Sequence, residues 1–422
     1  MRKILLYTLM TLAAAGMASC EDFLTRDTYD QIGSDEFWKS ETDLELYANG
    51  FIQKMIPGDG TITRGDIYAD YCAVDIPTDL LRPDGNVSPD NQTGWAESNW
   101  TNLRRVNYML DNMHKCKGRV SDEIYNHYEG VARFWRAWFY YDKVQTFGAV
   151  PWYDFTIAAS DKEAMMKPRD SREYVMDKVL EDLTFASTYC LSDAKFTKGS
   201  ALINKWVALA FKSRVCLFEA AYRRYHNLTG LEITPEELYR EAAKAAKLVI
   251  DNSGCSLNTA AGKKGAYRDL FYSETPLTQE VILAVCANEK SGIFGEQNWW
   301  FNARSYGLCW SLVRSFVHTY LKQDGTPFTA AADYAVKSFA EEMEGRDLRL
   351  EQTVRGRNFL WDGKTAVADI KNLSLTGYQV IKYTLDESKY DGGAKNINSI
   401  PLIRYAEVLL NYAEAQAELG VI

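Results

Sequence analysis

The chain has 422 residues, and its 46% hydrophobic and 25% charged residues are ordinary proportions for a globular protein. Its formal net charge of −9 comes without a block of Lys and Arg, which argues against nucleic-acid binding, since a phosphate backbone requires a basic surface. Aromatic residues make up 13% of the chain, so we expect some of them to meet a ligand or a partner as well as the core.

The first 19 residues have the pattern of a secretory signal peptide. Arg2 and Lys3 form its charged start, and residues 4–15 form an apolar stretch that is too short to span a membrane. The end of this segment, Met17-Ala18-Ser19-Cys20, resembles a bacterial lipoprotein signal, in which Cys20 becomes the lipidated N-terminus. We therefore expect a signal peptide at 1–19 and a mature chain that is held to a membrane by lipid on Cys20.

A helix that is apolar around most of its circumference occupies the region 128–152. Its hydrophobic side chains follow the i, i+3, i+4, i+7, i+8 spacing of one helical face at Val131, Phe134, Trp135, Trp138 and Phe139. Gly148 is a suitable helix cap and Pro151 prevents continuation of the helix. We predict a buried central helix, surrounded by other helices, that ends in a sharp turn.

Further helical regions predict a mainly α fold built from interrupted repeats of tetratricopeptide type. The predicted repeat regions are about 99–150, 169–225, 235–254 and 401–419. The start of the third is the firmest, because Thr234, Pro235 and Glu237 form a capping box with proline at the first helical position. Gly- and Pro-rich stretches at about 57–99 and 255–400 predict an irregular half, with short strands at 281–285 and 378–383.

The sequence offers little for catalysis or for a bound metal. GxSxG, HExxH, GxxxxGK[ST] and GxGxxG motifs are all absent, and the four histidines are more typical of surface or packing positions. The eight cysteines are widely spread and include no CxxC pair, so neither a zinc site nor a disulfide framework is indicated. A calcium loop near Asp84 and Asp90 remains an alternative, although it does not fit the EF-hand pattern. We expect no enzymatic activity, no cofactor and no metal.

Two loop stretches combine aromatic and hydrogen-bonding side chains in the way that sugar recognition requires. The apolar face of a pyranose packs on a Trp or Tyr ring, while Asp, Asn and Arg pair with its hydroxyl groups. The candidate ligand-binding residues are Asp79, Arg82 and Trp95 in the first stretch, and Asn298, Trp299, Trp300 and Tyr306 in the second. Each aromatic side chain could instead belong to the core, which is the reading we favour for Trp100 at the start of a helix.

Four segments, in this order, resemble the SusD/RagB family of outer-membrane nutrient-binding lipoproteins. They are the lipoprotein signal, DEFWKSETDLELYANGF at 35–51, ARFWRAWFYYDKVQTFGAVPW at 132–152 and RYAEVLLNYAEAQAELG at 404–420. The resemblance implies four tetratricopeptide-like helix pairs that carry an irregular, loop-rich ligand-binding half. It also places Arg82 and Trp95 in the region where starch-binding members have part of their aromatic arc.

The resemblance implies a function as well as a fold. A single SusD-like domain over 20–422 would capture an oligosaccharide, or in some cases a peptide, and deliver it to a SusC-like TonB-dependent transporter at the outer membrane. Family members continue past the helix at 401–419, so we expect the C-terminus to be truncated and that helix to expose apolar surface. The alternatives are a peptide- or protein-binding repeat module and, with less support, a secreted glycan-cleaving enzyme.

Overall fold

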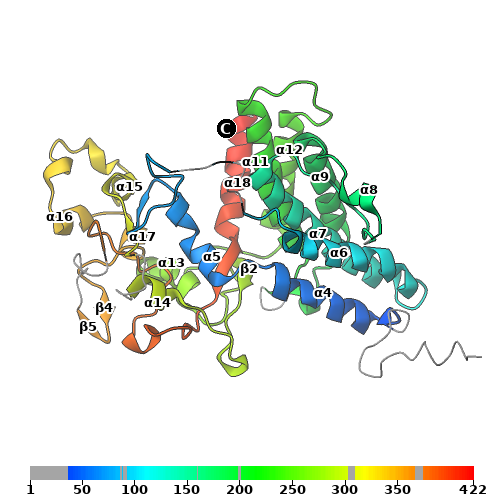
Figure 1. Ribbon diagram of the computed structural model, residues 1–422. Coiled ribbons are helices and arrows are strands. Elements are labelled where there is room, and N and C mark those ends of the chain that lie inside the picture. The colour runs from blue at the N-terminus through cyan, green and yellow to red at the C-terminus, as the bar shows by residue number, and fades with distance from the viewer. Residues whose placement is uncertain are drawn as a thin grey trace, which may run out of the picture.

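The computed structural model describes residues 37–85, 88, 93–158, 160–197, 201–302, 309–365 and 374–422. Within them the chain forms two parts that lie side by side (Figure 1). The first, which we call the helical half, consists of α4 (Glu41–Met55), α6 (Thr101–Asn112), α7 (Asp122–Phe147), α8 (Lys162–Met165), α9 (Arg172–Tyr189), α10 (Ala194–Thr197), α11 (Lys205–Tyr225), α12 (Pro235–Asn252) and α18 (Tyr405–Glu418). This arrangement confirms the predicted mainly helical fold class.

The second part, the irregular half, is built from short elements joined by loops. Its helices are α5 (Asp59–Arg64), α13 (Gly262–Tyr272), α14 (Gln297–Asn302), α15 (Arg314–Thr319), α16 (Phe339–Met343) and α17 (Leu348–Glu351). The strands form three two-stranded antiparallel pairs: β1 (Cys72–Ala73) with β3 (Ser311–Leu312), β2 (Val281–Val285) with β6 (Ile400–Arg404), and β4 (Leu360–Trp361) with β5 (Lys364–Thr365). The strand predicted at 378–383 is wrong, because this segment makes only isolated bridges through Gln379 and Val380.

Helix α7 is the centre of the helical half, and it has the sharp exit that the sequence predicts. It packs against α4, α6 and α9. It ends at Gly148, whose φ of 68° is a conformation that glycine adopts without a steric penalty. The Tyr140 hydroxyl then holds the exit turn, because it donates to the carbonyl of Pro151 at 3.2 Å and accepts from the amide of Tyr153 at 2.6 Å.

The remaining helices pack one after another from α7 outward. Helix α9 lies against α7 and α11, α11 lies against α12, and α12 lies against α18. A glycine permits a close approach of α7 and α9: a Cβ on Gly130 of α7 would lie 2.9 Å from Cys190 Sγ and 3.4 Å from Ala186 Cα. Any other residue at position 130 would therefore require Cys190 or α9 to shift.

Buried ion pairs join the same helices. Arg136 of α7 makes two hydrogen bonds to Asp182 of α9, at 2.7 and 2.8 Å, and both side chains are buried. Glu219 of α11 pairs with Arg172 of α9 at 2.7 Å and with Arg223 at 2.6 Å. Removing one partner of a buried ion pair is costly, because the remaining charge stays buried without a counter-charge.

The helical half joins the irregular half through β6. We expected a helix from residue 401, but residues 401–404 are extended and pair with β2, with Val285 opposite Ile400 and Val281 opposite Arg404. The helix begins only at Tyr405, and α18 packs against α11 and α12. One apolar side chain of α18, Leu410, is 69% exposed.

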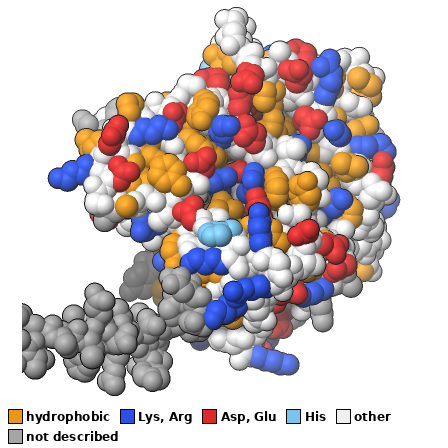
Figure 2. Space-filling model, turned by 90° about the vertical axis from the view of Figure 1, so that its right-hand side faces the viewer, with side chains coloured by type: hydrophobic (Ala, Val, Ile, Leu, Met, Phe, Trp, Pro, Cys, Tyr) orange, Lys and Arg blue, Asp and Glu red, His pale blue; other side chains and the backbone are white. Residues whose placement is uncertain are grey.

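The surface of the helical half is mixed in charge. Figure 2, which views the molecule from that side, shows Lys and Arg side chains interspersed with Asp and Glu and with small hydrophobic groups. Among the helices in the described part of the chain, none is long and apolar enough to cross a membrane.

We expect the Arg136–Asp182 pair to stabilise the packing between α7 and α9, and this can be tested by mutation. Replacing Asp182 with alanine should lower the free energy of unfolding by about 3–5 kcal/mol, because Arg136 would keep a buried charge without its bidentate partner. Urea unfolding followed by circular dichroism measures the change. Glu181→Ala is the matched control on the same helix: its exposed carboxylate pairs with Lys178, and its loss should cost about 1 kcal/mol or less. Equal losses in the two variants would contradict the role assigned to Asp182.

A buried histidine makes the stability of the helical half depend on pH. His127 of α7 is 1% exposed, its Nδ1 atom accepts a hydrogen bond from the amide of Leu191 at 3.1 Å, and its ring lies 4.1 Å from that of Phe196. Burial lowers the pKa of His127 from 6.5 to about 4, with a smaller contribution from the charge of Lys195. The folded chain therefore holds this imidazole neutral in mildly acidic solution.

The free energy of unfolding should fall as the pH decreases from 6.5 to about 4. In this window the unfolded chain takes up a proton on His127 that the folded chain does not, so stability is complete above the window and decreases within it. The lowered pKa of His127 corresponds to a loss of about 3 kcal/mol in the free energy of unfolding when the pH has reached about 4. Urea unfolding at several pH values should give a shallower dependence for His127→Gln, whereas His114→Gln, at an exposed position, should retain the original slope. Identical slopes in the two variants would show that His127 is not responsible.

Candidate functional site

The second candidate stretch, on α14, lies against α5, which precedes the first candidate stretch in the chain. Asp59 Oδ2 accepts a hydrogen bond from the amide of Glu296 at 3.1 Å and from Gln297 Nε2 at 2.9 Å. The guanidinium of Arg64 lies 3.9 Å from the centre of the Trp300 ring, whose Nε1 donates to Glu296 Oε2 at 3.0 Å. Trp300 is thus held in one orientation by a cation on its ring and a carboxylate at its edge.

Asp79 and Arg82 lie on the surface of the irregular half, in the loop that follows β1. Arg82 donates to both carboxylate oxygens of Asp84, at 3.1 and 2.8 Å, and pairs with Asp79 at 3.4 Å. All three side chains are exposed. The two carboxylates fix the plane of the guanidinium, and a fixed guanidinium plane suits recognition of paired oxygens on a ligand.

Trp95 lies on the helical half, at the end of α7. Its ring makes edge contacts with Trp100 at 5.4 Å and Phe147 at 4.9 Å, and the guanidinium of Arg169 lies 4.5 Å from its centre. The preceding residue, Gly94, accepts a 2.6 Å hydrogen bond from Lys143 Nζ of α7. Trp95 is 37% exposed, so part of the ring still reaches solvent. Trp100 is half-buried against the core, as the sequence predicts.

Asn298 is a correction to the predicted site. Its side chain is fully buried and fully hydrogen-bonded: it donates to the carbonyl of Leu385 and to Asp391, and it accepts from the amide of Leu385 and from Asn396 Nδ2, all within 3.1 Å. An amide with no free hydrogen-bonding group and no exposed surface cannot contact a ligand. Asn298 instead anchors α14 to the segments that follow it in the chain.

The remaining predicted residues have varied placements. Trp299 is half-buried on α14, beside Trp300. Tyr306 and Cys20 lie outside the described residues. The structure therefore brings α5 to Trp300, leaves Arg82 on the loop after β1, and places Trp95 on the helical half.

The irregular half also contains an open groove of about 280 Å³ that was not predicted from the sequence. We call it the aromatic groove; it is lined by Tyr267, Phe316, Thr319, Tyr320, Leu321, Asp347 and Arg349. Phe316 is held in place by stacking on Tyr71 at 4.6 Å, and the Tyr320 ring lies 6.0 Å from Phe316. The groove could not be recognised from one stretch of sequence, because α13, α15 and α17 each supply part of it.

The polar groups of the aromatic groove keep fixed roles near neutral pH. Burial raises the pKa of Tyr267 and of Tyr320, so both phenols remain protonated. The hydrogen bonds that Arg349 donates to Asp347, at 3.0 and 2.5 Å, lower the pKa of that carboxyl, which remains ionised. Arg349 itself is 63% exposed and offers further N–H groups to a ligand. The groove thus combines ring faces with a fixed donor and acceptor pair.

In the part of the chain that the structure describes, no group of three or more His, Cys, Asp or Glu side chains is placed to hold a metal ion. Asp84, the described member of the calcium loop considered above, is paired with Arg82.

Comparison with known protein families gives two matches that divide the chain between them. The model of the SusD family matches residues 279–421. A second family model, described as starch-binding and associating with the outer membrane, matches residues 10–217.

Individual proteins give the same result. A SusD-like protein of Formosa agariphila is 24% identical over 439 aligned positions, which cover 96% of this chain and 76% of that protein. A crystal structure of a SusD-like protein from Bacteroides fragilis superposes with a TM-score of 0.69 at 22% identity, over 94% of this chain and 79% of the other. A SusD-like carbohydrate-binding protein from the same species gives a TM-score of 0.70 at 20% identity, over 91% and 75%. With both family models, these relatives and the shared architecture in agreement, the chain belongs to the SusD/RagB family.

Proposed function

We propose that the chain is a cell-surface lipoprotein that binds an oligosaccharide on its irregular half and delivers it to a SusC-like TonB-dependent transporter in the outer membrane. The protein performs no chemistry on the sugar. The observation that carries the proposal is the aromatic groove, in which ring faces and an Asp–Arg pair face the same open space.

The groove has the two features by which proteins recognise sugars. The apolar C–H face of a pyranose packs on an aromatic ring, and Phe316 and Tyr320 supply rings that are half-buried and held by their neighbours. The sugar hydroxyls need both donors and acceptors, which Arg349 and the Tyr267 and Tyr320 phenols can supply together with Asp347. Because the groove is open, a longer chain can extend beyond it.

Other residues of the same half extend the proposed site. Trp300 has its ring orientation fixed by Arg64 and Glu296, and Trp299 is its neighbour on α14. Arg82 and Asp79 offer a fixed, exposed pair of charges. We assign Tyr306 and Trp95 to ligand contact as well, Trp95 at a separate position on the helical half.

The family comparison supports both the ligand class and the location. The family model is described as starch-binding and associating with the outer membrane, and one of the matching structures is named as that of a carbohydrate-binding protein. Lipid on Cys20 would provide the membrane attachment, and the transporter would receive the ligand from the protein that covers it.

Calorimetry against a panel of oligosaccharides tests the ligand. We expect at least one glycan to bind without release of reducing ends, and both Tyr320→Ala and Trp300→Ala to weaken that binding about tenfold or more, because each removes a ring on which the sugar packs. Tyr174→Ala is the control, since Tyr174 is an exposed ring on α9 of the helical half.

Three results would contradict the proposal. Released reducing ends would indicate the glycan-cleaving enzyme, and binding of peptides but of no glycan would indicate a peptide-binding module. Equal weakening by Tyr174→Ala would show that the sugar is not held on the irregular half.

The lipid anchor has its own test. In a bacterium that processes lipoproteins, the chain should incorporate labelled palmitate and sediment with the outer-membrane fraction, and Cys20→Ala should abolish both, because the lipid is attached to that thiol. Cys72→Ala removes a buried cysteine instead and should leave both unchanged. Retention of the label in Cys20→Ala would show that Cys20 is not the modified residue.

A further inference from the structure

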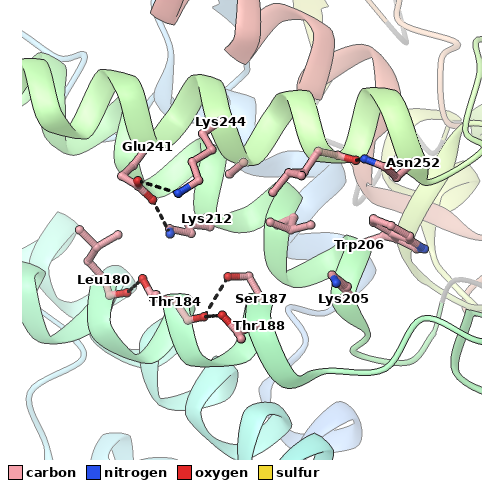
Figure 3. A pocket seen from close by; sticks show the side chains of 13 residues that line it. Leu180, Thr184, Ser187, Thr188, Lys205, Trp206, Lys212, Glu241, Lys244 and Asn252 are labelled. Carbon is pink, nitrogen blue, oxygen red and sulfur yellow. Dashed lines mark hydrogen bonds and ion pairs between the residues drawn. The ribbon is translucent and has the colours of Figure 1, made fainter.

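A second groove lies on the helical half, between α9, α11 and α12. We call it the helical groove; its volume is about 820 Å³, and the side chains that line it are shown in Figure 3. It exists because α9 and α12 both pack against α11 and leave a valley above that helix. The glycan-binding residues proposed above do not line it, so a ligand of this groove would be separate from the glycan.

The floor of the helical groove is aliphatic. Leu209 and Ala245 are buried beneath it, and Leu180 and Leu248 line its sides, with Leu248 41% exposed. Trp206 is the single aromatic ring among the lining residues. Sugars pack on flat rings, whereas branched aliphatic side chains pack on a surface of this kind, so the floor favours a ligand with apolar side chains.

The charges along the groove favour an anionic ligand. Three lysines and one glutamate line it, which leaves a local charge of plus two in a chain whose formal charge is −9. Glu241 is already paired with Lys212 at 2.7 Å and with Lys244 at 3.5 Å. Lys205 and Trp206 lie at the opposite end of the groove from Glu241 and its two lysine partners (Figure 3). A ligand that carries carboxylates at intervals could meet a cation at both ends.

The wall formed by α9 presents hydrogen-bond acceptors to a ligand. The hydroxyls of Thr184, Ser187 and Thr188 each donate their hydrogen to a carbonyl of their own helix, at 2.7, 3.1 and 2.7 Å. Their oxygen atoms can therefore only accept from a ligand. An extended peptide has free backbone N–H groups for this purpose, whereas a helix uses most of its own internally.

From these features we propose that the helical groove binds an extended acidic peptide segment of another protein, with its apolar side chains on Leu209, Ala245 and Leu248 and its carboxylates toward Lys205 and Lys244. The segment runs along the valley between α9 and α12 and donates backbone N–H groups to the hydroxyls of α9. The site is separate from glycan binding and does not depend on it.

Fluorescence polarisation of rhodamine-labelled synthetic peptides tests the assignment on the purified chain. A short peptide of alternating Leu and Asp should bind, and the same peptide with Lys in place of Asp should not. Leu248→Glu should weaken binding of the Leu-Asp peptide about tenfold or more, because it places a like charge where an apolar side chain should pack. Lys205→Glu combined with Lys244→Glu should reverse the preference between the two peptides.

Lys247→Glu is the matched control. Lys247 is an exposed lysine of α12 that pairs with Asp251 and does not line the groove, so this variant should bind the Leu-Asp peptide within about twofold of the parent chain. Circular dichroism confirms that each variant is folded. Absence of Leu-Asp binding by the folded parent chain overturns the proposal, and so does an equal loss in Lys247→Glu. Binding of an oligogalacturonide that Leu248→Glu weakens, without binding of the peptide, would show that the groove takes an acidic sugar instead.

Discussion

Helix α7 is apolar on almost every side, and the few polar side chains that it buries determine where its neighbours lie. Arg136 requires a carboxylate and finds it in Asp182, which fixes α9. Tyr140 requires partners for its hydroxyl and binds the exit turn at Pro151 and Tyr153. Lys143, whose pKa is lowered by burial, donates to the carbonyl of Gly94 and so fastens the segment before α6. Because unsatisfied buried polar groups are expensive, each of these contacts is a constraint on the whole helical half.

The irregular half takes its position from a small junction. Strand β6 pairs with β2 and runs directly into α18, so the last helix is continuous with the pair of strands that holds the loops. Arg404 reinforces the junction through a 2.7 Å ion pair with buried Glu280. The aromatic groove and Trp300 lie on the short helices and loops of the irregular half, while the helical groove lies on the long helices. Scaffold and binding loops can thus differ in sequence independently, as is usual for loops carried on a rigid framework.

The sequence predicted the structural features that adjacent residues determine, and it missed those that depend on contacts between distant segments. The end of α7 and the start of α12 follow from adjacent residues, Gly148 in one and Thr234 with Glu237 in the other, and both were foreseen. The strand at 401–404 was not, because its pairing partner lies more than a hundred residues away. Asn298 was wrongly predicted to contact a ligand. The residues that occupy its hydrogen-bonding groups, 385, 391 and 396, are far away in the sequence, so these contacts could not be foreseen. The aromatic groove was missed for the same reason, since three separate helices form it.

The close approach of α9 at Gly130 has a consequence for thiol chemistry. It encloses Cys190, whose pKa burial raises well above its ordinary value, and burial raises that of Cys216 to about 12. The thiolate is the form that attacks a disulfide, so thiols that stay protonated and enclosed exchange very slowly. Conditions are oxidising outside the cytoplasm, where we propose that the chain is located, and there these two cysteines would be protected once the helices have packed. For Cys190, the enclosure is tight at position 130: even a Cβ there would lie 2.9 Å from the sulfur, so any larger residue would force the thiol or its helix to shift.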